Sequence, residues 1–207
     1  MKIKTLFISI FFCFLLASCG NPVQVSVETG SQKSAIDVIM TRTSVRSYTD
    51  KEIDDATVDT LLKAAMAAPS AVNKQPWAFV VVRDTAIIHQ LAEAQLSRNP
   101  NSPIYGAKLV IAVCGDMEKA LPDAARTYWV QDASAATENL LLAAHSLGLG
   151  AVWTGVYPMQ QRVENVSKVL GLPGNILPLN LIPIGYPAEN PEPKNKWDST
   201  KVHYNKW

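Results

Sequence analysis

Two arginines and two hydroxyl side chains stand close together in the segment Thr41-Arg-Thr-Ser-Val-Arg-Ser-Tyr48. Arg42 and Arg46 flank Thr43 and Ser44, which concentrates cationic and hydrogen-bonding groups on a short stretch of chain. Arginine binds phosphate through a bidentate fork of N–H donors, so this set suits a phosphate or a polyol. The same residues also suit the C-terminus of a solvated helix, where positive charge offsets the helix dipole. Taken alone, the segment favours that simpler interpretation.

A second polar segment, Ala68-Pro-Ser-Ala-Val-Asn-Lys-Gln-Pro-Trp77, leads directly into an apolar run at residues 79–82. Pro69 ends the preceding helix, because proline has no N–H to donate and its ring clashes with the preceding turn. Ser70, Asn73 and Gln75 then place polar groups at a helix-to-strand junction, where sites are often built. Asn and Gln offer paired donors and acceptors, which suits the edge of a planar, amide-rich heterocycle. An ordinary capped turn is the alternative.

Helical and strand patterns alternate around these segments and predict an α/β (α+β) fold. Helices are expected over residues 35–41, from Asp54 or Asp55 to Ala68, after Asp84, and over residues 123–147 and 160–170. Buried strands are expected over residues 79–82 and 109–114, with further strands over residues 150–156 and 176–184. The helix at 123–147 is apolar on most sides, which places it in the core or a subunit interface. Pro178 and Pro183 exclude the last strand from a regular central position over its whole length.

The C-terminal tail, residues 187–207, is rich in proline, then charged, and ends in aromatic side chains. Tyr204 and Trp207 need cover from water, because exposed apolar patches usually mark an interface. The tail therefore either packs on a partner subunit or folds back on its own domain.

Together the two polar segments resemble the FMN-dependent nitroreductase family. That family has an Arg-x-Ser-x-Arg/Lys segment, an amphipathic helix, and then Ala-Pro-Ser-x-x-Asn-x-Gln-Pro-Trp, in the order and spacing found here. The resemblance continues through residues 132–150, Trp153-Thr-Gly155 and the tail, and covers about everything from Ser34 onward. It implies a mixed sheet flanked by helices, built as an intertwined homodimer with bound FMN.

The resemblance gives each motif residue a role around FMN. Arg42 and Ser44 match positions near the ribityl and phosphate groups, and Thr43 offers its backbone beside them. Arg46 matches the basic residue near the flavin N1/O2 edge, where a cation would stabilise the reduced flavin and raise its potential.

Further cofactor contacts come from three other places in the resemblance. The polar turn matches a segment supplied by the other subunit, with Pro69, Ser70, Ala71, Asn73 and Gln75 as its cofactor-binding candidates. The loop carrying Trp153, Thr154 and Gly155 matches backbone that approaches the isoalloxazine, and glycine leaves that approach open. Lys194 and Lys196 match a Lys-x-Arg pair that holds the phosphate; the second lysine lacks a bidentate fork but still binds phosphate as a point charge.

The reaction implied is ping-pong electron transfer, with the flavin supplying the redox chemistry. NAD(P)H or another donor reduces FMN, and a small aromatic acceptor, a nitroaromatic or a quinone, takes its place. A relative catalysing dehalogenation or azoline oxidation is an alternative within enzymes. A lipid-tethered flavin- or ligand-binding protein without turnover and a structural envelope lipoprotein are alternatives of other classes.

The N-terminus has the pattern of a bacterial lipoprotein signal. Lys2 and Lys4 precede an apolar run at residues 6–16, too short for a comfortable membrane span, and the run ends in Leu-Ala-Ser-Cys19. We expect a signal peptide over residues 1–18, a lipid-modified Cys19, a flexible tether over 19–33 and the domain over 34–207. An ordinary secretory signal or an uncleaved anchor is the alternative. The expected location is the bacterial cell envelope, facing the periplasm, where NAD(P)H is scarce.

Composition supports one globular domain and excludes several functions. Hydrophobic residues make up 48% and charged residues 18% of the chain, as in ordinary globular proteins. The net charge of +1 argues against nucleic-acid binding by phosphate neutralisation. Cys114 is expected to be a buried small hydrophobe on a strand, and the spacing of the three histidines predicts no metal site.

Overall fold

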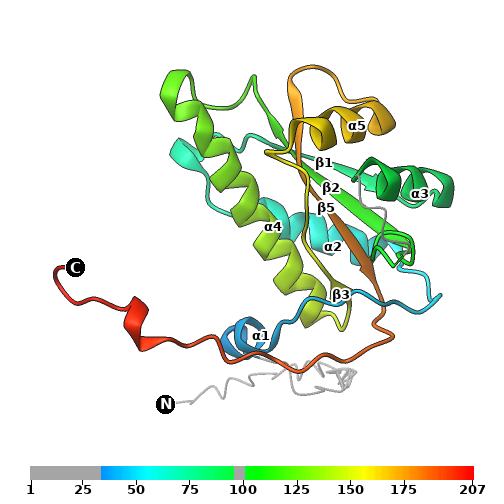
Figure 1. Cartoon of the computed structure of the whole chain (residues 1–207), viewed down its shortest axis with the longest axis horizontal. Helices are drawn as coiled ribbons and strands as arrows, with labels where there is room; N and C mark the ends of the chain where they lie inside the picture. The colour runs from blue at the N-terminus through cyan, green and yellow to red at the C-terminus, as the bar shows by residue number, and fades with distance from the viewer. Residues whose placement is uncertain (1–33, 96–100) are drawn as a thin grey trace, which may run out of the picture. The chain divides into compact units, whose positions relative to one another are not determined.

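The computed structural model describes residues 34–95 and 101–207. Its centre is an antiparallel sheet in the order β1-β2-β5-β3, with β4 also paired to β5 (Figure 1). The strands are β1 (Trp77–Val82), β2 (Leu109–Asp116), β3 (Gly150–Ala151), β4 (Thr154–Gly155) and β5 (Ile176–Gly185). The predicted signal peptide, Cys19 and tether lie outside the described residues.

Helices cover both faces of the sheet, which confirms the α/β class. They are α1 (Ala35–Thr41), α2 (Asp55–Met66), α3 (Thr85–Ala94), α4 (Tyr128–Ser146) and α5 (Gln160–Leu170), with short 3₁₀ turns η1 (Ala71–Asn73), η2 (Asp123–Thr127) and η3 (Ser199–Lys201). Asp54 caps α2 by accepting the N–H of Thr57, and Asp84 caps α3 by accepting those of Ala86 and Ile87. No helix in the described ranges is long and apolar enough to cross a membrane.

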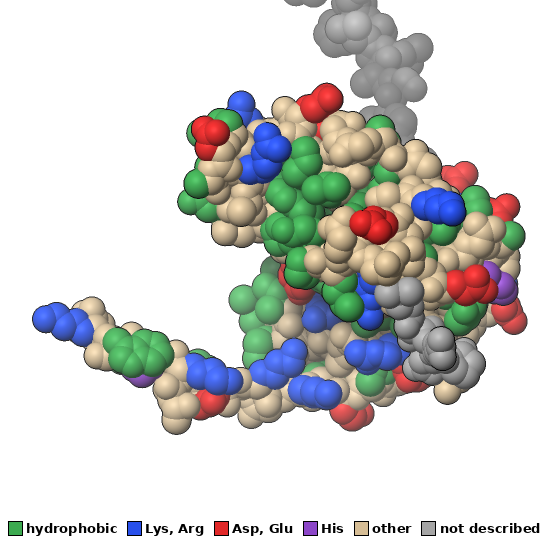
Figure 2. Space-filling model, turned by 45° about the horizontal axis from the view of Figure 1, so that its top comes forward, with side chains coloured by type: hydrophobic (Ala, Val, Ile, Leu, Met, Phe, Trp, Pro, Cys, Tyr) green, Lys and Arg blue, Asp and Glu red, His purple; other side chains and the backbone are tan. Residues whose placement is uncertain are grey.

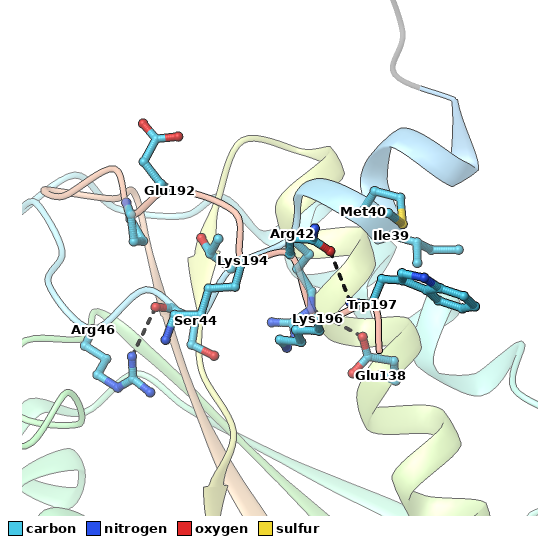
Figure 3. Close-up of a pocket in the computed structure, with 13 residues that line it drawn as sticks. Ile39, Met40, Arg42, Ser44, Arg46, Glu138, Glu192, Lys194, Lys196 and Trp197 are labelled. Carbon is cyan, nitrogen blue, oxygen red and sulfur yellow. Dashed lines mark hydrogen bonds and ion pairs between the residues drawn. The ribbon is translucent and has the colours of Figure 1, made fainter. Parts of the chain in front are cut away.

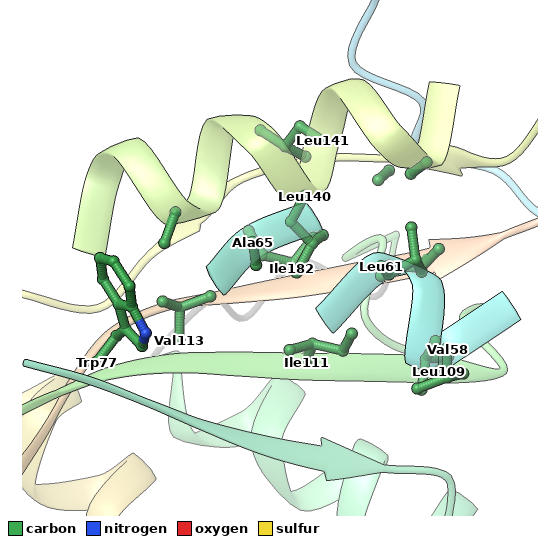
Figure 4. Close-up of a cluster of buried hydrophobic side chains, with 14 of the residues drawn as sticks. Val58, Leu61, Ala65, Trp77, Leu109, Ile111, Val113, Leu140, Leu141 and Ile182 are labelled. Atoms are coloured by element: carbon green, nitrogen blue, oxygen red, sulfur yellow. The ribbon is translucent and has the colours of Figure 1, made fainter. Parts of the chain in front are cut away.

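Strand β2 is buried along its whole length and divides the core in two. Leu109, Ile111 and Val113 pack toward α2 and α4, in the cluster shown in Figure 4. The alternate residues Val110, Ala112 and Cys114 pack with α3 and α5 on the other face. Successive strand side chains point to opposite faces, so a strand covered on both sides must be apolar throughout.

Cys114 is a buried, neutral thiol, as predicted. Burial raises the pKa of its thiol to about 12, well above the ordinary value for cysteine. A thiol held neutral in the core is a poor nucleophile, since the thiolate is the reactive form.

Strand β5 occupies the central position that its two prolines argued against. The pairing is interrupted near both of them: Pro178 pairs with Cys114 of β2 at a register shift, and on the other side of β5 Pro183 lies between the parts that pair with β4 and β3, while its pairing with Val110 of β2 stays in register. Proline lacks the N–H that a regular ladder needs, so these interruptions explain how it is tolerated here.

Three other elements differ from their predictions. Strand β1 is only partly buried: Trp77 and Val82 are buried but Val81 is 39% exposed, and the strand pairs only with β2 in the described chain. The strand expected over 150–156 is two two-residue strands separated by Val152 and Trp153. The helix expected over 123–147 begins as a 3₁₀ turn, and α4 proper starts at Tyr128 and packs one long face against α2 and the sheet.

Candidate functional site: a cationic hollow beside the sheet

The segment carrying Arg42 and Arg46 leaves α1 and is fastened to the edge of the sheet. Val45 donates its N–H to the carbonyl of Ala151 in β3, at 3.1 Å. Gly150 permits this approach, since a Cβ there would lie 2.5 Å from Cγ1 of Val45. The backbone that presents the two arginines is therefore held by main-chain contacts rather than by the arginines themselves.

Tyr48 fixes the far end of the same segment. Its hydroxyl lies within hydrogen-bond distance of the carbonyls of Val45, at 2.8 Å, and Pro183, at 3.1 Å. Burial raises the pKa of Tyr48 well above its ordinary value, with Arg46 lowering it and Glu189 raising it by smaller amounts. The phenol therefore stays protonated and donates to carbonyl oxygens, which locks the segment against β5.

The start of the C-terminal tail runs alongside this segment. Ala188 donates its N–H to the carbonyl of Ser47 at 3.0 Å, and the Glu189 carboxylate accepts N–H groups from Arg46, at 2.6 Å, and Ser47, at 3.2 Å. A carboxylate that accepts two neighbouring backbone donors forms short, charge-assisted bonds. Glu189 thereby fixes the direction in which the tail continues.

The tail and the arginine segment enclose a hollow of about 620 Å³, shown in Figure 3. Six predicted site residues line it: Arg42, Thr43, Ser44, Arg46, Lys194 and Lys196. Glu138 of α4 and Glu192 of the tail add two carboxylates, so four cations face two anions and leave a formal excess of two positive charges. This excess suits a dianionic group such as a phosphate monoester.

Arg42 is the least exposed of the four cations that line the hollow, and it forms an ion pair there. Its side chain is 18% exposed, and its Nε lies 3.3 Å from Oε1 of Glu138 (Figure 3). Arg46 is exposed and donates to the carbonyl of Ser44 at 3.3 Å. The guanidinium of Arg42 thus contacts α4, whereas that of Arg46 stays beside its own backbone.

The polar turn at residues 69–75 does not line this hollow within one chain. Ser70 Oγ accepts a hydrogen bond from the backbone N–H of Gln75 at 2.9 Å, and Asn73 Oδ1 accepts one from Nε2 of Gln75 at 3.0 Å. Ala71 donates its N–H to Oδ1 of Asp132 in α4, at 2.8 Å. Pro69, Asn73 and Gln75 are exposed. Their predicted contact with a flavin held by the other subunit stays a prediction.

The loop carrying Trp153, Thr154 and Gly155 also lies outside the hollow. The Thr154 hydroxyl donates a hydrogen bond to the carbonyl of Leu181 at 2.6 Å, and the Gly155 carbonyl accepts one from Nη1 of Arg162 at 3.0 Å. A Cβ at Gly155 would meet nothing within 4 Å, so open space lies beside that backbone. This open space is compatible with the predicted approach of the isoalloxazine to the Gly155 backbone.

Comparison with known proteins identifies the family. The model described as the Nitroreductase family matches residues 39–104 and 98–186 of this chain. This chain belongs to the nitroreductase family. The family inferred from the two polar segments is therefore confirmed.

Similar nitroreductases align over most of the chain. A protein from Methanothermobacter thermautotrophicus, provisionally named an NADH dehydrogenase/NAD(P)H nitroreductase, is 42% identical over 190 residues, or 89% of this chain and 95% of its own. A crystal structure with the same provisional name, from Bacteroides thetaiotaomicron, is 45% identical with a TM-score of 0.77 and covers 84% of this chain and 98% of its own. A provisionally named nitroreductase from Desulfovibrio desulfuricans, solved in complex with FMN, is 30% identical with a TM-score of 0.71, covering 86% and 99%.

The sequence did not predict three acidic residues that contact the proposed site of this nitroreductase. Glu138 contacts Arg42, Glu189 holds the backbone of Arg46, and Asp132 holds that of Ala71. Each partner is remote in the chain, so no local spacing connects them. The one available signal was that Asp132 and Glu138 are the two acidic residues of α4, whose other residues are uncharged or histidine.

Proposed function

We propose that this chain is an FMN-dependent oxidoreductase that passes electrons from NAD(P)H, or another donor, to nitroaromatic or quinone-type acceptors. The observation that carries the proposal is the cationic hollow between the arginine segment and the tail. Its volume of about 620 Å³ lies within the range of small-molecule sites. Its excess of two positive charges suits the dianionic phosphate of FMN.

The residues of the hollow divide the work of binding that phosphate. Arg42 offers a planar fork of donors, Ser44 a hydroxyl, and Lys194 and Lys196 compact charges. Exposed lysines contribute less than a preorganised guanidinium, because ordering their long side chains costs conformational entropy. We therefore assign Arg42 the largest share of phosphate affinity.

Bound FMN would supply the electron transfer itself, in both halves of a ping-pong cycle. Arg46 would place a cation toward the flavin ring, where it favours the negative charge of the reduced form. Its exposure and its single hydrogen bond to Ser44 leave its guanidinium available for that contact. The open backbone at Gly155 would leave room for an approaching ring.

We further propose that the active form is a homodimer in which the turn at residues 69–75 reaches the flavin of the partner subunit. Support comes from that turn, which is exposed and lies away from the hollow of its own chain. Support also comes from the tail, which Figure 2 shows as an extended arm carrying basic and hydrophobic side chains. Trp197 is 73%, Tyr204 84% and Trp207 100% exposed, so burial against a partner would remove a large apolar area from water. Light scattering with and without residues 194–207 tests this, and a monomer that holds a full complement of FMN contradicts it.

The location proposed is the bacterial cell envelope, with the chain held to a membrane by lipid on Cys19. The proposal rests on the Leu-Ala-Ser-Cys19 motif alone. A Cys19→Ser variant should leave the membrane fraction for the soluble one. Unchanged membrane fractionation of that variant would mean that another feature anchors the chain.

Initial-rate kinetics of the purified full chain test the reaction. With NADH or NADPH and a quinone or nitroaromatic acceptor, double-reciprocal plots at several acceptor concentrations should give parallel lines. Intersecting lines would exclude the ping-pong cycle. Retention of FMN with no turnover of any donor would favour the alternative, a lipid-tethered flavin-binding protein.

A further inference from the structure

We propose that Asp132 is a positioning residue: it holds the turn at residues 69–75 in the conformation that binds FMN. This inference rests on the proposed function, because the turn matters to the cofactor only if the chain binds one. It concerns a residue that makes no contact with the cationic hollow and acts through the backbone of Ala71.

Asp132 is a buried carboxylate whose hydrogen-bond partner is the backbone N–H of Ala71. It is 7% exposed, whereas aspartate is almost never buried unless it is paired. Its Oδ1 accepts the N–H of Ala71 at 2.8 Å, and none of the ion pairs found in residues 34–95 and 101–207 includes it. Burying a carboxylate without a neighbouring cation is unfavourable. We therefore infer that Asp132 is buried because its carboxylate binds the turn.

The turn itself is under backbone strain. Val72, Asn73 and Gln75 have φ angles of 48°, 55° and 49°, in the left-handed region that non-glycine residues avoid. For Val72 the conformation is a true outlier, because its β-branched side chain crowds the backbone. Val72 is also 78% exposed, so burial of its side chain does not compensate. Hydrogen bonds within the turn, such as that from the N–H of Gln75 to Ser70 Oγ, oppose this strain, and the contact from Ala71 to Asp132 adds an external one.

Helix α4 supplies that contact and links the turn to the rest of the proposed site. Asn139 donates to the carbonyl of Ala64 at the end of α2, at 3.0 Å, and so fixes the chain just before the turn. Glu138 pairs with Arg42 at 3.3 Å in the hollow. Asp132 and Glu138 lie six residues apart, or about 9 Å along the helix axis. One helix thus contacts both cofactor segments of its own chain and holds the turn through Asp132.

The experiment compares three variants of the full chain in detergent, Asp132→Ala, Asp132→Asn and Asp116→Ala. Asp116 is the control: it is a buried carboxylate, 8% exposed, whose side chain accepts the N–H of Glu118 and contacts Asn175 and Lys119, all outside the turn. Its backbone N–H donates to the carbonyl of Pro76, next to the turn, and the substitution keeps that bond. For each we would measure FMN affinity by fluorescence titration of the apoprotein. Amide hydrogen exchange over residues 69–75, without FMN, reports the turn directly.

Asp132→Ala should weaken FMN binding about five- to thirtyfold, the effect of an unsatisfied backbone donor, and should speed exchange in the turn. Asp132→Asn keeps an acceptor oxygen and should stay within about threefold of the wild type. Asp116→Ala should lower thermal stability while leaving FMN affinity unchanged.

Wild-type FMN affinity and wild-type exchange in Asp132→Ala would overturn the positioning role while leaving the proposed function intact. Equal loss of FMN affinity in Asp116→Ala would overturn it too, since the effect would then be one of general stability. If Asp132→Ala does not fold, Asp132→Leu decides, because it removes the acceptor but keeps a similar side-chain volume: faster exchange confined to the turn supports the role, and exchange unchanged there overturns it. A wild-type chain that binds no FMN overturns the proposed function, and the role with it.

Discussion

Replacing Arg42 with alanine should weaken FMN binding ten- to a hundredfold. A hydrogen bond to a charged group contributes about 1.5–3 kcal/mol, and each 1.4 kcal/mol is about a factor of ten in affinity. The existing ion pair with Glu138 reduces this only slightly. Glu138 has a half-exposed side chain, and partly exposed ion pairs contribute about 0–1 kcal/mol. The phosphate therefore outcompetes Glu138 for the guanidinium.

Arg42→Lys separates charge from geometry at the same position. Lysine keeps the positive charge but loses the planar fork, so we expect an intermediate loss of affinity. The matched control is Arg83→Ala, which removes an arginine that pairs with Asp55 at 2.9 Å and donates to the Ile53 carbonyl at 2.7 Å, away from the hollow. That variant should alter stability and leave FMN affinity unchanged.

Fluorescence titration of the apoprotein with FMN, and separately with riboflavin, is the assay. Riboflavin lacks the phosphate, so the loss caused by Arg42→Ala should disappear with that ligand. Equal losses for FMN and riboflavin would place Arg42 away from the phosphate. Unchanged FMN affinity in Arg42→Ala would remove it from the site altogether.

Three further predictions follow from the charges and burial described above. Glu138→Gln should tighten FMN binding by up to about fivefold, because it removes a competing negative charge from the hollow; weaker binding in the same titration would mean that Glu138 is needed to orient Arg42. Because burial raises the pKa of Cys114 to about 12, its thiol should resist alkylation in the native protein at pH 8 and react after unfolding, as peptide mass spectrometry would detect; rapid native labelling would contradict its burial. A hydrogen bond from the backbone N–H of Thr57 lowers the pKa of Asp54 in the native state. The stabilisation from ionised Asp54 should therefore be complete above its unfolded-state pKa of about 3.9 and lost as pH falls through its lower native pKa. Melting temperatures of Asp54→Asn and wild type should therefore converge in acid, and a constant difference across pH would contradict this.

The sequence predicts elements well where one local rule decides them. Asp84 followed by an amphipathic pattern gives α3, and the unbroken apolar run at β2 gives a strand buried on both faces. It fails where pairing partners decide. Whether β1 lies at an edge, or β5 at the centre despite Pro178 and Pro183, depends on strands remote in sequence.

The same division holds for the site. Lys194 and Lys196 could be joined to Arg42 and Ser44 only through the family resemblance, and the hollow brings the four together. The acidic residues that contact the two polar segments, Asp132, Glu138 and Glu189, were not predicted. Asp132 contacts a residue 61 positions away and Glu189 one 143 positions away, and periodicity within a helix or a tail carries no trace of such partners.

The measurement that tests the account most directly is the visible absorbance of the purified full chain, reconstituted with FMN under anaerobic conditions. The account predicts bound flavin bands that bleach on addition of NADH or NADPH and return when a quinone or nitroaromatic is added. A chain that takes up no FMN, or whose bound FMN stays oxidised with both nucleotides and returns no electrons to an acceptor after chemical reduction, would contradict it.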